Sequence, residues 1–301
     1  MSFEKIIGND KVKDFLNKQI EENHILHSYL FVGTEGIGKK IFAREFARKI
    51  LCLSQEKTED CLSCIKWKSN NHPDFFEIEP ENKVIKIEQI RQMQERISEK
   101  PITSKRKVYI INDSELMTKE AQNCLLKTLE EPPEYITIIL ISSNESKLLN
   151  TIKSRCMKIS FEVIEEQIIE AYLKNKLQMD ISSELIKFSE GSIGRAIILE
   201  EQKEIYQQVN SVISNIEKQD LITILNNAEV LYKEKEKIQE ILEYINVFLY
   251  HTKEIKKINC IKFVEEAKKR LISNSNYDMC IDYLLIKLWE EMNEKHSRSQ
   301  I

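Results

Sequence analysis

The sequence predicts an α/β domain, with a parallel sheet between layers of helices, followed by an all-helical region. Three observations support this fold class. Up to residue 161, short apolar runs rich in β-branched residues alternate with segments of helical period. All five prolines lie at positions 73 to 133, so no proline interrupts a helix beyond them. After residue 162 the apolar residues recur with the period of a helix.

Strands and helices are expected in alternation over the front half. Buried parallel strands read as continuous apolar runs, and segments with one apolar face lie between them. The helix after the first strand has Ile41, Phe42 and Phe46 on that face, and the prolines at 132–133 end the last helix. The expected strands are 28–33, 74–80, 107–113, 135–143 and 157–161, and the expected helices are 39–51, 87–97 and 118–133.

The back half is expected to form a helical bundle. Apolar residues spaced three and four apart are typical of bundle core rather than of a binding surface. We expect domain boundaries near residues 162 and 205, which no low-complexity linker marks. The apolar stripes are Ile168, Ile169, Tyr172 and Leu173; Leu185, Ile186 and Phe188; Ile238, Ile241, Leu242, Ile245, Phe248 and Leu249; and Met279, Tyr283, Ile286 and Trp289.

Composition and charge narrow the class of protein. The chain of 301 residues is 31% charged, with a net charge of −4. It contains no apolar run of the roughly eighteen residues that a membrane helix needs, and its first residues are too polar for a signal peptide. Seven cysteines in such a chain are typical of reduced thiols, so we expect a soluble cytoplasmic protein without membrane partners. A mildly acidic chain is not by itself a nucleic-acid clamp.

A glycine-rich loop follows the first expected strand. Five of the six glycines fall in "GTEGIG" (33–38) and "GSIGR" (191–195), which indicates backbone that turns sharply or approaches something closely. In "GTEGIGKK", a phosphate-binding loop is matched by Gly33, Gly36, Gly38 and Lys39, but Lys40 stands where a hydroxyl would bind magnesium. The strand before the loop and the helix after it favour phosphate binding. The alternative is a glycine-rich turn that binds nothing.

Several segments, in order, resemble one family. They are "FEKIIGNDKV" (3–12), "HSYLFVGTEGIGKK" (27–40), "NHPDFFEIEP" (71–80), "IEQIRQMQERI" (87–97), "KVYIINDSELMTKEAQNCLLKTLEEPP" (107–133), "SRC" (154–156) and "GSIGRA" (191–196). The chain thereby resembles the clamp loaders of bacterial DNA polymerase III, which are AAA+ proteins, and within them the delta-prime branch. The most specific signal is "NCLLKTLEEPP" followed by "SRC". Beyond "GSIGRA" the likeness is limited to helical character.

The resemblance implies a domain plan and a set of partners. It implies an AAA+ P-loop domain with an inserted cysteine module over residues 1–162, a small helical lid over 163–205 and a helical collar for oligomerisation over 206–301. It also implies a hetero-pentamer with gamma/tau ATPase subunits and delta. The sliding clamp and primer-template DNA would be contacted through that assembly during replication.

Two departures from the family's ATPase pattern affect the expected activity. Lys40 cannot coordinate magnesium, and in "VYIINDSE" the acidic pair of the second nucleotide motif reads Asn112-Asp113. Because phosphoryl transfer depends on the metal to offset developing charge, we expect that ATP hydrolysis is lost, while nucleotide binding stays open. The alternatives are an active AAA+ ATPase, as a motor subunit or helicase loader, and an unrelated P-loop kinase. The kinase gives no reason for "TLEEPP" or "SRC".

Two arginines and a serine complete the candidate site by resemblance. Arg155 in "SRC" matches the family's arginine that reaches the γ-phosphate bound by a neighbouring subunit, which predicts an arginine finger acting in trans. Ser142, the last but one residue of the fourth expected strand, is placed with the degenerate nucleotide site. Arg195 in "GSIGRA" occupies the lid position that would face a nucleotide in the chain's own loop. A solvated surface arginine is the alternative for either arginine.

A cysteine cluster suggests a metal. Cys52, Cys61 and Cys64 have the spacing at which the family often binds structural zinc with four cysteines, but Trp67 occupies the fourth place. His72 is near enough in sequence to be a candidate fourth ligand. The alternatives are that the thiols are free and that His72 belongs only to the turn "HPD". Zinc is therefore a possible structural cofactor.

Overall fold

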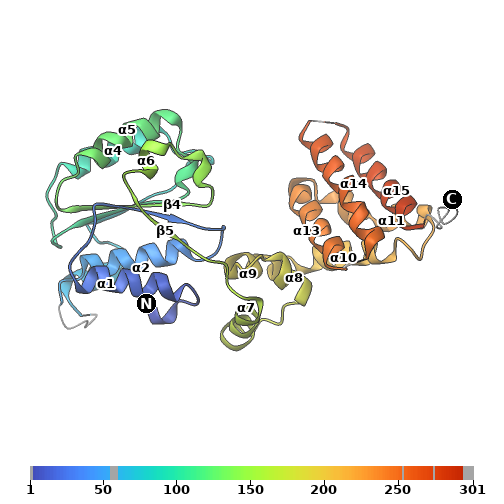
Figure 1. Cartoon of the computed structure of the whole chain (residues 1–301), viewed down its shortest axis with the longest axis horizontal. Coiled ribbons are helices and arrows are strands. Elements are labelled where there is room, and N and C mark those ends of the chain that lie inside the picture. Colours follow the sequence, from blue (N-terminus) through green and yellow to red (C-terminus); the bar gives the residue numbers. More distant parts are fainter. Residues whose placement is uncertain (1–2, 55–59, 253, 274, 294–301) are drawn as a thin grey trace, which may run out of the picture. The chain divides into compact units, whose positions relative to one another are not determined.

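The computed structural model describes residues 3–54, 60–252, 254–273 and 275–293 (Figure 1). The chain divides into two compact units. The first extends to Ile169 and also contains Gly191–Arg195, and the second consists of Glu170–Glu190 and the chain from Ala196 onward. The "GSIGR" stretch therefore packs with the front half of the sequence. Residues 55–59 of the expected cysteine module lie outside the described residues.

The first unit is built on a parallel sheet of five strands in the order β2-β3-β4-β1-β5. The predicted strands and their parallel arrangement between helices are confirmed. Each strand occupies a run of apolar residues that the sequence shows, and β3 and β4 are buried along their whole length. The strands are β1 (Ser28–Val32), β2 (Phe75–Ile78), β3 (Lys107–Ile111), β4 (Ile136–Ser142) and β5 (Met157–Ser160).

Alternation of side chains along the strands creates two cores, one on each face of the sheet. Phe31 and Ile110 point into one core, while their neighbours Leu30 and Tyr109 point into the other. Figure 1 shows helices on both faces. The first core is covered by α1 (Asp10–Glu21) and α2 (Lys39–Leu51), and the second by α4 (Ile87–Ile97), α5 (Lys119–Glu130) and α6 (Asn150–Lys153).

Short elements fill the connections, and one detail of the predicted helix faces is wrong. The connections contain α3 (Leu62–Lys68) and single turns at Phe3–Lys5, Ser114–Leu116 and Glu145–Lys147. On α2, Ile41 was expected in the core but is 49% exposed. The buried face of α2 is centred on Phe42 and Phe46 instead, because Ile41 lies one position, or about 100°, around the helix from that face.

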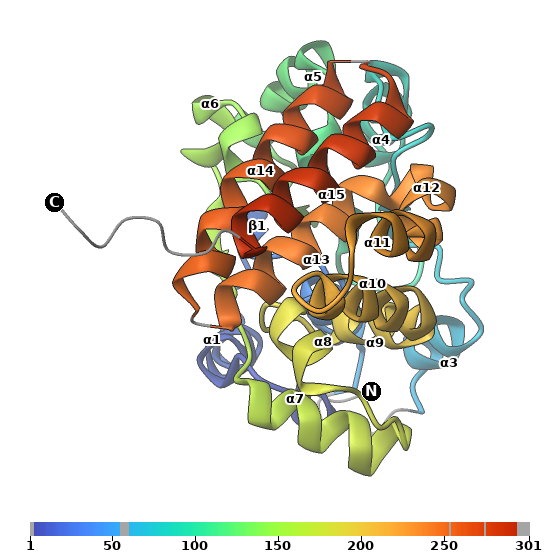
Figure 2. The same ribbon diagram turned by 90° about the vertical axis from the view of Figure 1, so that its right-hand side faces the viewer.

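The second unit is entirely helical within the residues described, as predicted. Its last three helices pack side by side, α13 against α14 and α14 against α15 (Figure 2). The bounds are α7 (Glu166–Tyr172), a π-helical turn at Leu173–Leu177, α8 (Ser183–Phe188), α9 (Ile193–Glu201), α10 (Lys203–Asn215), α11 (Leu221–Asn227), α12 (Glu229–Lys233), the turn Lys235–Lys237, α13 (Ile238–His251), α14 (Ile255–Ile272) and α15 (Tyr277–Asn293). The division between the units crosses α7 and α9.

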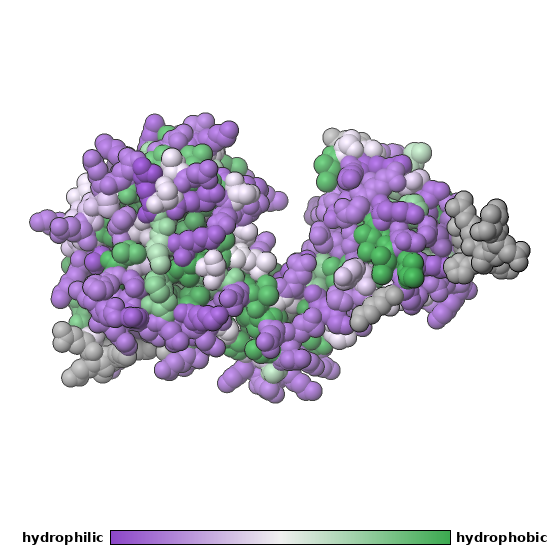
Figure 3. Space-filling model, in the orientation of Figure 1, coloured by the Kyte–Doolittle hydropathy of each residue, from purple (hydrophilic) through white to green (hydrophobic). Residues whose placement is uncertain are grey.

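The stripe expected on the last helix is displaced. Met279 is 69% exposed, whereas Ile281, Leu284 and Leu288 are fully buried. Both stripes have a helical period, so the pattern alone did not distinguish the face that packs against α14. Of the helices described, none is both long and apolar enough to cross a membrane. Hydrophilic side chains cover most of the face drawn in Figure 3.

Candidate functional site

The two glycine-rich stretches meet in the first unit. The Gly194 N–H donates to the Gly36 carbonyl at 3.1 Å. A Cβ added at Gly36 would lie 2.5 Å from the Ser192 hydroxyl, and one added at Gly194 would lie 2.8 Å from the Gly36 carbonyl. The close approach that glycine clustering predicts is therefore an approach of these two stretches to each other.

The loop lysine is buried and binds the loop itself. Gly38 has φ of 100° and caps α2, so Lys39 begins the helix. The Lys39 ammonium donates to the carbonyls of Gly33 at 2.7 Å and Thr34 at 2.8 Å, and to the Ser143 hydroxyl at 3.0 Å. Burial lowers the pKa of Lys39, and nearby carboxylates, that of Glu115 first, oppose this effect. The Lys39 side chain thus links the start of the glycine loop to the residue that follows β4.

Lys40 and Asn112 share a carboxylate that sequence reasoning did not identify. Lys40 Nζ lies 2.6 Å from Glu79 Oε1, and Asn112 Nδ2 donates to Glu79 Oε2 at 3.1 Å. Glu79 comes directly after β2, and Asn112 directly after β3, its neighbour in the sheet. An ammonium and an amide N–H thus bind the Glu79 carboxylate from the two positions where the motif would have a hydroxyl and a carboxylate. These residues do not fit a magnesium ion.

Further carboxylates lie around the loop. Burial, followed by the charges of Glu115, Glu35 and Glu79, raises the pKa of Asp113. Glu115 also accepts a hydrogen bond from the Ser143 N–H at 2.9 Å. The position of Glu79 and Glu115 after parallel strands was the available signal, since the carboxyl ends of such strands meet at one edge.

Ser142 and Arg195 were both expected at the nucleotide site, and the backbone of Arg195 lies beside the glycine loop. The hydroxyl beside Lys39 belongs to Ser143, whereas the Ser142 hydroxyl accepts from the Asn144 N–H at 3.1 Å within its own turn. Ser143 therefore replaces Ser142 as the contact of the loop lysine. Arg195 lies in the first turn of α9, where its N–H donates to the Ser192 hydroxyl at 3.1 Å. The backbone of Arg195 is thus beside the glycine loop.

Arg155 lies at the amino ends of the strands, whereas the glycine loop lies at their carboxyl ends. The Arg155 carbonyl accepts a hydrogen bond from the Ser28 hydroxyl at 2.6 Å. Ser28 begins β1 and Gly33 follows it, so a five-residue strand, roughly 15 Å long, separates Arg155 from the glycine loop. The guanidinium pairs with Glu130 at 2.8 Å and donates to the Thr151 carbonyl at 2.9 Å. Arg155 is too far away to act in its own chain's loop.

The three cysteines form a cluster that could hold a metal ion. The Sγ atom of Cys52 lies 3.8 Å from that of Cys61 and 3.6 Å from that of Cys64. Thiolates about 2.3 Å from a tetrahedral zinc ion would be about 3.8 Å apart, so this geometry fits three of four ligands. Burial opposes ionisation of Cys61, but hydrogen bonds, first from the Cys64 N–H, lower its pKa to about 7.

His72 and Trp67 lie near the cluster but have other partners. His72 Nε2 is 2.9 Å from the Ser63 hydroxyl, and its Nδ1 accepts from the Asp74 N–H at 3.1 Å. Both ring nitrogens are thus engaged, and His72 is not among the residues whose ligand atoms converge. Trp67 packs on Phe75 with ring centroids 4.5 Å apart. An aromatic contact stands where the family often has a fourth cysteine.

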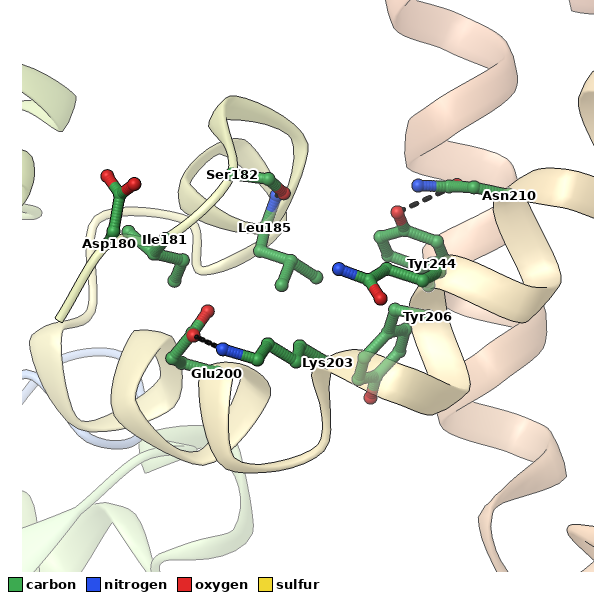
Figure 4. Close-up of a pocket in the computed structure, with 10 residues that line it drawn as sticks. Asp180, Ile181, Ser182, Leu185, Glu200, Lys203, Tyr206, Asn210 and Tyr244 are labelled. Carbon is green, nitrogen blue, oxygen red and sulfur yellow. Dashed lines mark hydrogen bonds and ion pairs between the residues drawn. The ribbon is translucent and has the colours of Figure 1, made fainter.

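A pocket of about 250 Å³ lies in the second unit (Figure 4). Two of its three charged groups pair with each other, since Lys203 lies 2.6 Å from Glu200, and Asp180 is the third. The Tyr244 hydroxyl donates to Asn210 at 2.8 Å. None of the residues expected at a functional site lines this pocket, so we place the candidate site at the glycine loop and at Arg155.

The chain is similar in sequence to subunits of DNA polymerase III. A family model described as "DNA polymerase III, delta subunit" matches residues 8–165. The chain is 29% identical to "DNA polymerase III subunit delta'" of Bacillus subtilis, over 93% of this chain and 96% of that protein. It is 32% identical to "DNA polymerase III subunit tau/gamma" of Haemophilus influenzae, over 71% of this chain but only 33% of that protein.

The solved structure of a gamma-subunit-related protein of DNA polymerase III from Thermotoga maritima is similar in fold. Its TM-score is 0.50 at 19% identity, and the match covers 92% of this chain and 99% of that chain. A likeness at this identity shows the fold alone.

Proposed function

The chain belongs to the clamp-loader family of DNA polymerase III subunits, and we propose that within it the chain is a delta-prime-type subunit that does not hydrolyse ATP. In this role it helps to load the sliding clamp onto primer-template DNA. Its partners are the gamma/tau ATPase subunits and delta in a hetero-pentamer, and it meets the clamp and DNA through that assembly. The match along nearly the whole of the Bacillus subtilis delta' protein supports this choice.

The observation that carries the proposal is the Lys40–Glu79 pair at 2.6 Å, with Asn112 donating to the same carboxylate. In P-loop ATPases a hydroxyl and a carboxylate support the metal that offsets charge on the transferring phosphoryl group. Here the partly exposed ammonium of Lys40 and the amide of Asn112 stand in their place. An ammonium repels a divalent cation, so the chain's own loop lacks the support that hydrolysis needs.

Arg155 supplies the second part of the proposed function. Its place at the sheet edge opposite the glycine loop is compatible with reaching a nucleotide that a neighbouring subunit binds. There the guanidinium would offset charge that develops in the transition state, as arginine fingers do. The chain would complete a neighbour's active site while its own loop stays inactive.

An active ATPase subunit is the second candidate. The 32% identity to the Haemophilus influenzae tau/gamma protein over 71% of this chain favours it. The two functions differ in ATP turnover by the isolated chain. We expect turnover at background. Hydrolysis at several turnovers per minute that Lys39→Ala abolishes would establish the ATPase and refute our proposal.

A gain-of-function variant tests the role of the replaced metal ligands. Lys40→Thr combined with Asn112→Asp restores a hydroxyl and a carboxylate beside Glu79. We expect nucleotide binding by this variant, measured by titration calorimetry, to become stronger in magnesium than in EDTA by about tenfold. The unchanged chain should show no such difference. Equal behaviour of both proteins would mean that other residues keep the metal out.

We also propose that the cysteine cluster holds structural zinc. The three sulfur atoms, spaced as tetrahedral zinc ligands would be, support it and supply three of the four ligands. The ion would tie the start of α3 to the segment that follows α2.

A further inference from the structure

Groups from two helices hold the guanidinium of Arg155. Glu130 Oε1 lies 2.8 Å from its NH2 atom, and NH1 donates to the Thr151 carbonyl at 2.9 Å and the Ser154 hydroxyl at 3.3 Å. Glu130 ends α5, Thr151 lies in α6, and these helices pack together. We call these three groups the Arg155 cradle. The Arg155 side chain remains 34% exposed, so the cradle fixes a guanidinium that still faces solvent.

Glu130 stands where a carboxylate is electrostatically unfavourable. It is the last residue of α5, and the aligned peptide dipoles leave partial negative charge at a helix C-terminus. The double proline at 132–133 prevents the helix from extending past this point. A cation beside Glu130 offsets both negative contributions. The pair with Arg155 therefore gives a physical reason for a glutamate at this position.

We propose that Glu130 is a positioning residue for Arg155, an inference that rests on the arginine-finger function proposed above. A long side chain that is already oriented loses less conformational entropy when it meets a phosphate. A guanidinium has five N–H donors, and the cradle engages NH1 and NH2 without using all of them. Arg155 can thus keep its bond to Glu130 while it donates to a phosphate oxygen of the neighbouring subunit.

The charge of Glu130 is tested in the loader reconstituted from the full chain and its partner subunits. Steady-state ATP hydrolysis is measured with clamp and primed DNA for Glu130→Gln and for Glu131→Gln, a matched control on the next, exposed carboxylate. We expect Glu130→Gln to lower kcat about threefold to tenfold and to change KM for ATP less than about twofold, since a finger acts in the transition state. Glu131→Gln should stay within about twofold of the unchanged loader in both constants.

A double variant and a charge-conserving variant separate positioning from a structural role. Glu130→Gln combined with Arg155→Ala should be no slower than Arg155→Ala alone, because positioning acts only through the arginine. Glu130→Asp should recover part of the kcat lost in Glu130→Gln, and it replaces that variant if Glu130→Gln does not fold. Thermal unfolding of each purified chain checks folding.

The outcomes distinguish this inference from the function on which it rests. If Arg155→Ala lowers kcat but Glu130→Gln behaves like Glu131→Gln, Glu130 does not position the finger, and the finger itself stands. Additive losses in the double variant would likewise overturn positioning. If Arg155→Ala leaves kcat unchanged, the arginine-finger function fails first.

Discussion

Burial of His72 makes the stability of the first unit depend on pH. Burial lowers the pKa of His72, and the charge of Asp74 only partly opposes this. The unfolded chain, with a histidine pKa near about 6.5, therefore takes up a proton before the folded chain does. Stability is complete above that value and is lost as the pH falls below it, by at most about 1.4 kcal/mol per pH unit.

This prediction is measured by urea unfolding at pH 7.5 and pH 5.5. We expect His72→Gln to lose less stability between these two pH values than the unchanged chain. His24→Gln is the matched control, because the His24 side chain is 74% exposed. Equal losses in all three proteins would mean that other groups account for the acid sensitivity.

Single residues also mark the limit of what the sequence could predict about the site. Lys40 and Asn112 were recognisable as departures because each occupies a known place in a motif. Glu79, which binds both, was not identified, since its role depends on β2 lying next to β3 and on the carboxyl ends of both strands. Ser142 was expected at the nucleotide site, but Ser143, the first residue after β4, contacts Lys39, and the sequence did not show where β4 ends.

At the scale of elements, the contact between the glycine loop and the start of α9 leads to a paired prediction. Gly36 and Gly38 both have positive φ, 72° and 100°. A Cβ at Gly36 would lie 2.5 Å from the Ser192 hydroxyl, whereas one at Gly38 would meet no atom within 4 Å. Gly38→Ala should therefore cost only backbone strain, about 1 kcal/mol, and Gly36→Ala about 1–2 kcal/mol more.

The free energy of unfolding of these two variants, measured in urea, checks this difference. Both substitutions carry the conformational cost of a side chain at positive φ, so an excess for Gly36→Ala reports the packing of "GTEGIG" against "GSIGR". If the two substitutions cost the same, the two stretches do not touch in solution.

The cysteine module gives a second prediction at this scale. Zinc content after dialysis, measured by elemental analysis, should fall to background in Cys61→Ala, because only two thiolates remain. Cys124→Ala should retain the zinc, since Cys124 contacts Gln94 in the second core's periphery and not the cluster. His72→Ala should also retain it, because both ring nitrogens of His72 bind other partners. Loss of zinc in His72→Ala would restore that histidine as the fourth ligand.

Helices and strands could be predicted from the sequence where the apolar residues of the pattern are also the buried residues of the structure. The strands read as continuous apolar runs because both faces of a parallel sheet are covered. Helix faces were less certain: on α15 the stripe through Met279 and the buried stripe through Leu284 share one period. The partners of His72 could not be foreseen either, because Ser63 and Ser104 reach it from separate segments.

At the scale of the whole molecule, the candidate site has two parts, one at the carboxyl ends of the strands (the carboxyl edge of the sheet) and one at their amino ends. The carboxyl edge carries the glycine loop, where Lys39 binds the Gly33 and Thr34 carbonyls. The other edge carries Arg155, which pairs with Glu130. The family resemblance anticipated both parts from motifs, but a sequence shows neither their separation nor their partners. A subunit with this division can lose activity at one edge and keep a function at the other.

The last prediction compares these two edges in the reconstituted loader. Arg155→Ala should fold and assemble normally, since a partly exposed ion pair contributes about 1 kcal/mol or less. It should nevertheless lower DNA- and clamp-stimulated ATP hydrolysis by about tenfold or more, because an arginine finger can contribute about 10³ to 10⁵ at the site that it completes. Clamp loading, followed by transfer of labelled clamp to primed DNA, should fall in parallel.

Lys39→Ala is the matched change at the other edge. It removes two hydrogen bonds to the glycine loop and one to Ser143, and should lower the stability of the isolated chain by about 1–3 kcal/mol. Once this variant is assembled, its hydrolysis rate should stay within about twofold of the unchanged loader, because a loop without metal support contributes no turnover to lose. The two variants thus separate stability from catalysis, since we expect the stabilising lysine to be dispensable for hydrolysis and the partly exposed arginine to be required. The reverse order, with Lys39→Ala the slower loader, would make this chain a motor subunit and Arg155 a surface residue.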